Sequence, residues 1–93
     1  MIEQPTMVKI CDIAEESPGV KTFFFKWNLL FDPGQFVMVW IPLLDEKPFT
    51  ISYMQNDIMG ISVLKRGAFT TALHEKKTGD LIGIRGPYGK GFR

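Results

Sequence analysis

The chain has 93 residues, of which 45% are hydrophobic, with 11 basic and 10 acidic side chains and a formal charge of +1. This length suits one small domain, and the apolar share is too high for an intrinsically disordered chain. The positive residues are scattered along the sequence, so the chain lacks the basic stripe of proteins that bind nucleic acid.

The first half of the chain predicts three strands separated by two turns. The strands are expected at residues 7–14, 20–30 and 35–41. They are rich in β-branched and aromatic residues, and the first one alternates in hydrophobicity. The turns are Ser17-Pro18-Gly19 and Asp32-Pro33-Gly34, in which proline fixes φ and glycine permits a positive φ. Pro42 ends the third strand or places it at an edge.

The second half predicts three more strands and a helix. After a polar connection at 45–48, the elements are strands at 49–54 and 58–65, a helix at 69–77, a strand at 80–85 and a glycine-rich tail at 86–93. Phe69 and Leu73 share one face of the helix. Thr70 or Thr71 is expected to cap its start, and Gly79 to close its end in a left-handed conformation.

Six short strands with tight turns and one late helix indicate an all-β fold. We predict a six-stranded antiparallel Greek-key barrel with one short helix, filling the whole of residues 1–93 as one domain. A closed barrel also protects the strand edges from pairing with other chains.

The terminus and the single cysteine suggest a location. Residues 1–5 contain no basic region followed by a long apolar stretch, so we expect no signal peptide. The apolar run 36–44 is about half as long as a membrane span, so we expect no membrane contact. Cys11 is the only cysteine, which precludes an internal disulfide and an iron–sulfur cluster. We expect a cytoplasmic protein in which Cys11 is a buried structural thiol.

Four short motifs follow one another from residue 33 onward. They are Pro33-Gly34-Gln35-Phe36-Val37, Lys47-Pro48-Phe49-Thr50-Ile51-Ser52, Gly67-Ala68-Phe69-Thr70-Thr71-Ala72-Leu73, and the region from Gly79-Asp80 to Gly86-Pro87-Tyr88-Gly89-Lys90-Gly91-Phe92. Each motif alone is weakly specific. In this order and spacing they resemble the FAD-binding domain of the ferredoxin–NADP reductase superfamily. Within it they are most similar to the electron-transfer subunits of dihydroorotate dehydrogenases, while related hydrogenase and sulfide-dehydrogenase subunits remain open.

The resemblance implies that FAD binds on the outside of the barrel. The residues implied in its binding are Lys47, Pro48, Phe49, Thr50, Leu64, Lys65, Arg66, Gly67, Thr70 and Thr71. Lys47 would neutralise the pyrophosphate, Phe49 would lie against the flavin, and Thr50 would hydrogen-bond its N5–O4 edge. Gly67 would let the backbone approach the phosphates at the start of the helix. The family usually has arginine in place of Lys47, and lysine lacks the bidentate fork of arginine.

Each of these residues also has an ordinary structural interpretation. Taken alone, Lys47 is a solvated loop residue, Phe49 equally suits the barrel core, and Thr70 and Thr71 equally suit plain helix capping. We expect Ser52 to be structural. The only histidine, His74, has no partner at metal-ligand spacing, so we expect it at the surface and predict no metal site.

The resemblance implies part of an NAD(P)H-dependent flavin oxidoreductase. In the family, FAD passes electrons between NAD(P)H and an iron–sulfur or partner subunit, and a nicotinamide-binding domain follows the barrel. That C-terminal domain is absent from these 93 residues, so we expect no NAD(P)H turnover by this chain alone, weak FAD binding and a homo-oligomer. Two alternatives stay open: a non-catalytic flavin-binding barrel, and a structural or interaction barrel without a ligand.

Overall fold

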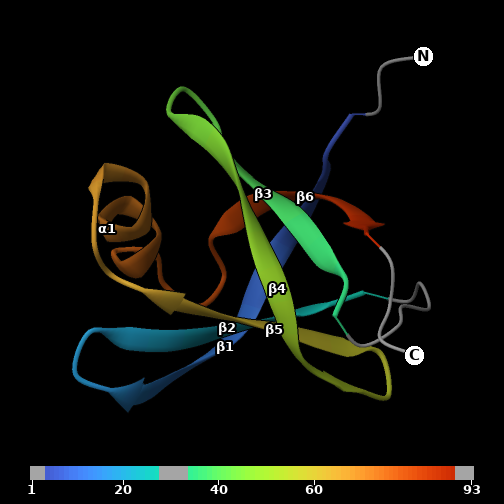
Figure 1. Ribbon diagram of the computed structural model, residues 1–93, viewed down its shortest axis with the longest axis horizontal. Coiled ribbons are helices and arrows are strands. Elements are labelled where there is room, and N and C mark those ends of the chain that lie inside the picture. The colour runs from blue at the N-terminus through green and yellow to red at the C-terminus, as the bar shows by residue number, and fades with distance from the viewer. Residues whose placement is uncertain (1–3, 28–33, 90–93) are drawn as a thin grey trace.

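The computed structural model describes residues 4–27 and 34–89 and confirms the all-β fold (Figure 1). Six strands close into a barrel, and one short helix packs beside it. The elements are β1 (Thr6–Ser17), β2 (Val20–Lys26), β3 (Phe36–Ile41), β4 (Asp45–Gln55), β5 (Ile58–Leu64), α1 (Ala68–His74) and β6 (Leu81–Tyr88).

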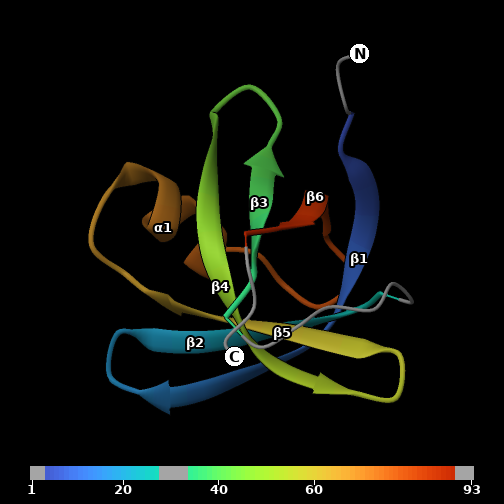
Figure 2. The same cartoon turned by 45° about the vertical axis from the view of Figure 1, so that its right-hand side comes forward.

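The strands close in the order β1-β2-β5-β4-β3-β6, with every neighbouring pair antiparallel. The pairing of β2 with β5 skips two strands of the sequence and gives the Greek-key crossover. Figure 2 shows β3 and β4 running steeply across the direction of β2 and β5, so the two halves of the barrel pack on each other at a large angle.

The core fills the space between these two halves. In β3, buried Val37, Val39 and Ile41 alternate with half-buried residues, as expected for a strand with one face inward. The side chains that are less than 2% exposed are Ile10, Phe23, Phe25, Val37, Val39, Met59, Ile61, Val63, Leu73, Ile82 and Ile84. Full burial of such a side chain contributes about 1.5–3 kcal/mol to folding, so this apolar interior is the main source of stability.

Strand β4 starts earlier than predicted, and the polar connection at 45–48 belongs to it. The preceding turn is tight, because the backbone N–H of Leu44 donates to the carbonyl of Ile41 at 3.0 Å. Asp45 therefore already lies opposite Ile41 in the ladder. Among the described residues, 45–50 pair with β3 alone, whereas 51–55 pair with β5. Pro48 lies in the first part, where one side of the strand needs no backbone donor.

Helix α1 is shorter than predicted and ends at His74. Phe69 and Leu73 are buried on one face, as expected. The N-cap residue is Gly67, and its backbone N–H donates to the hydroxyl of Thr70 in the first turn of the helix. Thr71 makes no such contact; its backbone N–H donates to the carbonyl of Gly67 at 2.8 Å.

Other predicted boundaries shift in both directions. Pro42 ends β3 as expected, and Gly34 and Gly79 have the positive φ angles of 93° and 96° that their turns need. Strand β6 continues through Tyr88, into the segment predicted to be a tail, because Tyr88 pairs with Phe36 of β3. The predicted strand residues 28–30 and turn residues 32–33 lie outside the described part of the chain.

The expectation for Cys11 was wrong. It follows Ile10, which is 1% exposed, and the alternation of β1 therefore turns the thiol outward, where it is exposed. Within residues 4–27 and 34–89, no helix has the length and apolar character needed to span a bilayer. The same residues contain no group of three or more His, Cys, Asp or Glu side chains placed to hold a metal ion.

Candidate functional site

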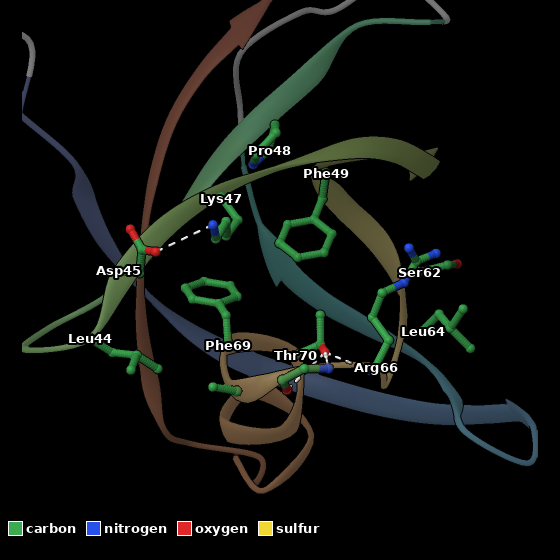
Figure 3. A pocket seen from close by; sticks show the side chains of 12 residues that line it. Leu44, Asp45, Lys47, Pro48, Phe49, Ser62, Leu64, Arg66, Phe69 and Thr70 are labelled. Carbon is green, nitrogen blue, oxygen red and sulfur yellow. Dashed lines mark hydrogen bonds and ion pairs between the residues drawn. The ribbon is translucent and has the colours of Figure 1, made fainter.

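A cavity of about 750 Å³ lies between the first half of β4, the end of β5 and the start of α1. Figure 3 shows its side chains converging from these three elements. It is lined by Leu44, Asp45, Lys47, Pro48, Phe49, Ser62, Leu64, Arg66, Gly67, Ala68, Phe69 and Thr70. Its volume falls within the usual range of small-molecule sites, about 300–1,000 Å³.

The cavity exists because β4 changes partners along its length. Where residues 45–50 pair with β3 alone, β5 has already turned toward α1, and a gap opens on the outside of the barrel. The helix start and Phe69 form the opposite wall. The predicted site therefore lies where β4 and β5, which pair along residues 51–55 of β4, separate.

The cavity brings together seven of the ten predicted site residues. These are Lys47, Pro48, Phe49, Leu64, Arg66, Gly67 and Thr70. The other three lie outside its lining. Thr50 is exposed on β4 opposite Phe36, and Lys65 is exposed with its backbone N–H bonded to the carbonyl of Gly19. Thr71 is half-buried in the first turn of α1.

The charged residues of the lining are Asp45, Lys47 and Arg66, which sum to one positive charge. Lys47 Nζ lies 3.4 Å from Asp45 Oδ2, and both side chains are 53% exposed. Asp45 Oδ1 also accepts a hydrogen bond from the backbone N–H of Glu46 at 2.7 Å. This backbone bond and the neighbouring Lys47 lower the pKa of Asp45 below its ordinary value. The carboxylate is thus a fixed negative charge beside the lysine.

Two phenylalanine rings form an apolar wall in the cavity. The ring centroids of Phe49 and Phe69 are 6.0 Å apart with an interplanar angle of 23°, and Figure 3 shows the two rings beside each other at the cavity. Phe69 is 7% exposed, and Phe49 is half-buried. From the sequence, Phe69 was expected only to share one face of the helix with Leu73. The signal for a second role was its position two residues after Gly67, which places the ring at the cavity as well as in the core.

The turn before α1 leaves open space above the backbone of Gly67. A Cβ built on Gly67 would meet no atom within 4 Å, and its backbone is extended with φ −156°, a conformation that any residue adopts. The fold itself therefore does not require glycine here. Thr70 Oγ1 accepts hydrogen bonds from the backbone N–H groups of Arg66 at 2.8 Å and Gly67 at 3.0 Å. These two donors are satisfied within the chain, and Thr70 serves to hold the turn.

His74 anchors the helix that carries this wall, and the prediction of a surface histidine was wrong. Its side chain is 8% exposed, with Nε2 2.7 Å from the carbonyl oxygen of Val63 and the ring 5.9 Å from that of Phe23. Lys21 Nζ donates to the carbonyl of His74 at 3.1 Å. Because a carbonyl only accepts, Nε2 carries a proton in this contact. The helix is thus tied to β5 through His74 and to β2 through Lys21.

Comparison with known sequences agrees with the resemblance that the motifs predicted. No protein-family model matches the chain. It is 48% identical over 91 residues to the probable dihydroorotate dehydrogenase B (NAD(+)) electron transfer subunit of Methanocaldococcus jannaschii, covering 98% of this chain and 34% of that protein. The protein of the same description from Methanothermobacter thermautotrophicus is 48% identical over 92 residues, covering 95% and 34%. The similarity confirms the predicted resemblance, and the chain spans about a third of the length of these relatives.

Comparison with solved structures confirms the fold. The NADH-dependent reduced ferredoxin-NADP oxidoreductase has a TM-score of 0.86 at 22% identity, covering 99% of this chain and 37% of that one. A ferredoxin NADP+ reductase from Neisseria gonorrhoeae, with bound FAD and NADP, has a TM-score of 0.76 at 19% identity, covering 94% and 38%. At these identities the match establishes the shared barrel and helix arrangement.

Proposed function

We propose that this chain is the FAD-binding part of an electron-transfer subunit that works with a dihydroorotate dehydrogenase. The observation that carries the proposal is the cavity at the β4–β5 separation, which combines a cation, a pair of near-parallel aromatic rings and an open glycine turn. The 48% identity to subunits of that description supports the choice among related oxidoreductases.

Each part of the cavity suits one part of FAD. Lys47 is a mobile point charge suited to a pyrophosphate, although Asp45 competes for it. The Phe49 and Phe69 rings offer a flat apolar surface for a ring system, where stacking contributes about 0.5–1.5 kcal/mol beyond area burial. The space over Gly67 allows a ligand to approach the backbone. When bound, FAD would supply the hydride and single-electron chemistry that the protein side chains lack.

We further propose that the nicotinamide site and the contact with a redox partner belong to sequence beyond these 93 residues. The relatives are about three times longer than the matched region, since it covers 34% of each. On this proposal the chain by itself binds FAD and does not oxidise NADH. The role of its residues is to hold the flavin and its pyrophosphate against the barrel.

An FAD titration of the purified chain tests the proposal. We expect a saturable change in flavin absorbance and fluorescence, because stacking on Phe49 and Phe69 alters the environment of the ring. Riboflavin, which lacks the pyrophosphate, should bind more weakly because it makes no contact with Lys47. A chain that gives no spectral change with FAD would instead be a structural or interaction barrel. Robust NADH oxidation by the chain alone would place the nicotinamide site within these residues.

A further inference from the structure

A row of hydroxyl groups crosses the outside of the barrel beside the cavity and ends on a carboxylate. Ser52 Oγ of β4 lies 2.9 Å from Ser62 Oγ of β5. Ser62 Oγ lies 2.8 Å from Thr22 Oγ1 of β2, which lies 2.9 Å from Glu16 Oε1 of β1. We call these four side chains the hydroxyl row. Ser62 is also part of the cavity lining, so the hydroxyl row connects Glu16 to the proposed site.

The carboxylate fixes the direction of every hydrogen bond in the row. An ionised carboxylate only accepts, so Thr22 donates its single proton to Glu16. Thr22 must then accept from Ser62, whose single proton is thereby used. Ser62 must in turn accept from Ser52. The competing acceptor for Ser52, the carbonyl of Gly60, is farther away at 3.3 Å.

Burial of Thr22 keeps the direction of these hydrogen bonds in place. Thr22 is 4% exposed, and its hydroxyl is held between two partners on different strands. Water therefore has little access through which to exchange with it. A chain of hydrogen bonds also polarises its members in the same sense, which strengthens each bond.

The direction determines what Ser62 offers to the cavity. A hydroxyl has one proton and two acceptor positions. In the row, the proton of Ser62 goes to Thr22 and one acceptor position is taken by Ser52. The remaining capacity is a single acceptor position. Ser62 can therefore pair with a ligand hydroxyl or amino group, whereas a phosphate oxygen, which only accepts, finds no proton there.

We infer that Ser62 is a further ligand-binding residue, oriented from a distance by Glu16 to accept a hydrogen bond from a hydroxyl or amino group of the ligand. The inference rests on the proposed function, in which the ligand is FAD. The hydroxyl and amino groups of FAD that can donate are its ribityl and ribose hydroxyls and its adenine amino group; the flavin ring also donates from its N3–H. Ser62 thus selects the part of the dinucleotide that faces β5, and Glu16 is a positioning residue that never touches it.

Reversing the row tests the inference without altering the cavity. In Glu16→Lys, an ammonium donates to Thr22, so Thr22 donates to Ser62, while Ser52 keeps its shorter bond to Ser62. Ser62 then accepts from both neighbours, and its own proton takes the cavity-facing position that was an acceptor before. The matched control is Glu15→Lys, which makes the same charge change at an exposed neighbour. We expect FAD to bind about threefold to tenfold more weakly to Glu16→Lys than to Glu15→Lys, the size of one hydrogen bond. Ser62→Ala should lower the affinity for FAD by a similar factor.

The two proposals fail in different ways. If the unsubstituted chain does not bind FAD, the proposed function and this inference both fall. If it binds FAD but Glu16→Lys and Glu15→Lys have equal dissociation constants, or Ser62→Ala binds as well as the unsubstituted chain, only the inference falls. Circular dichroism melts of all variants check that they are folded. Should Glu16→Lys not fold, Thr22→Val interrupts the row with a side chain of the same shape, and unchanged FAD affinity in that variant would also overturn the inference.

Discussion

Arg85 of β6 and Glu46 of β4 are joined by two hydrogen bonds, from Nε to Oε2 at 2.8 Å and from Nη2 to Oε1 at 2.7 Å. Strand β3 lies between these two strands in the barrel, so the pair reaches over one strand and ties its neighbours together. Arg85 also donates from Nη1 to the hydroxyl of Tyr88 at 3.0 Å. Such a bidentate, partly buried pair is stronger than an ordinary surface ion pair.

This pair predicts acid sensitivity of the fold. The hydrogen bonds from Arg85 hold the pKa of Glu46 below its ordinary value of 4.5, against a smaller opposing effect of burial. The unfolded chain therefore binds the proton more readily than the folded one. The stabilisation is fully present above about pH 4.5 and is lost as the pH falls through the lower folded-state pKa. Urea unfolding measured from about pH 7 to about pH 3 should show a smaller loss of stability in Glu46→Gln than in the unsubstituted chain. Equal acid sensitivity of the two proteins would contradict the prediction.

Removal of the cavity lysine, Lys47, should weaken FAD binding. Lys47→Ala is expected to cost about 1–3 kcal/mol of binding free energy if the ammonium makes a charge-assisted contact with the pyrophosphate. Lys47→Arg should bind FAD equally or more tightly, because arginine adds a bidentate fork. Lys77→Ala, an exposed lysine outside the cavity lining, is the control. Calorimetric titration that finds Lys47→Ala unchanged would remove this residue from the site.

Neutralisation of the carboxylate beside that lysine should have the opposite effect. Asp45→Asn keeps an acceptor for the backbone N–H of Glu46 but removes the negative charge that competes for Lys47. We expect FAD to bind more tightly by about 0.2–1 kcal/mol, the usual size of an exposed charge interaction, with the gain shrinking at high salt. Asp57→Asn, in the exposed turn between β4 and β5, is the matched control. Weaker binding by Asp45→Asn would mean that the carboxylate positions Lys47 rather than competing with the ligand.

Two glycines should respond differently to an added side chain. A Cβ on Gly67 meets no atom of the chain, so Gly67→Val should fold normally and lose FAD binding. A Cβ on Gly83 would lie 2.7 Å from Trp40 Cε3, so Gly83→Ala should be destabilised by about 1–3 kcal/mol. Thermal melts and FAD titrations of both variants separate the two roles. An unfolded Gly67→Val would assign Gly67 to folding, leaving its ligand role without support.

Much of the barrel could be predicted because period-two alternation and turn sequences report local geometry directly. The start of β4 was missed because Asp45 and Lys47 are polar, and their strand conformation comes from pairing with β3 rather than from their own propensity. His74 was placed at the surface because its neighbours in sequence are charged. Its burial depends on a carbonyl of β5 that only the folded chain brings near. The cavity residues were predicted through resemblance, since no local pattern reveals where β4 and β5 separate.

The docking of α1 makes the candidate site less stable than the barrel that supports it. A seven-residue helix does not persist alone in water, so α1 depends on Phe69, Leu73 and the His74 contact with β5. Local unfolding of this one element would remove a wall of the cavity while the strand ladders stay intact. A bound ligand that touches Phe69 would oppose this local unfolding. The backbone amides of α1 should then exchange with solvent more slowly, while those of β2 change little. Hydrogen exchange with and without FAD would measure this difference. A slower exchange of α1 alone would mean that the bound molecule stabilises one wall of its own binding site.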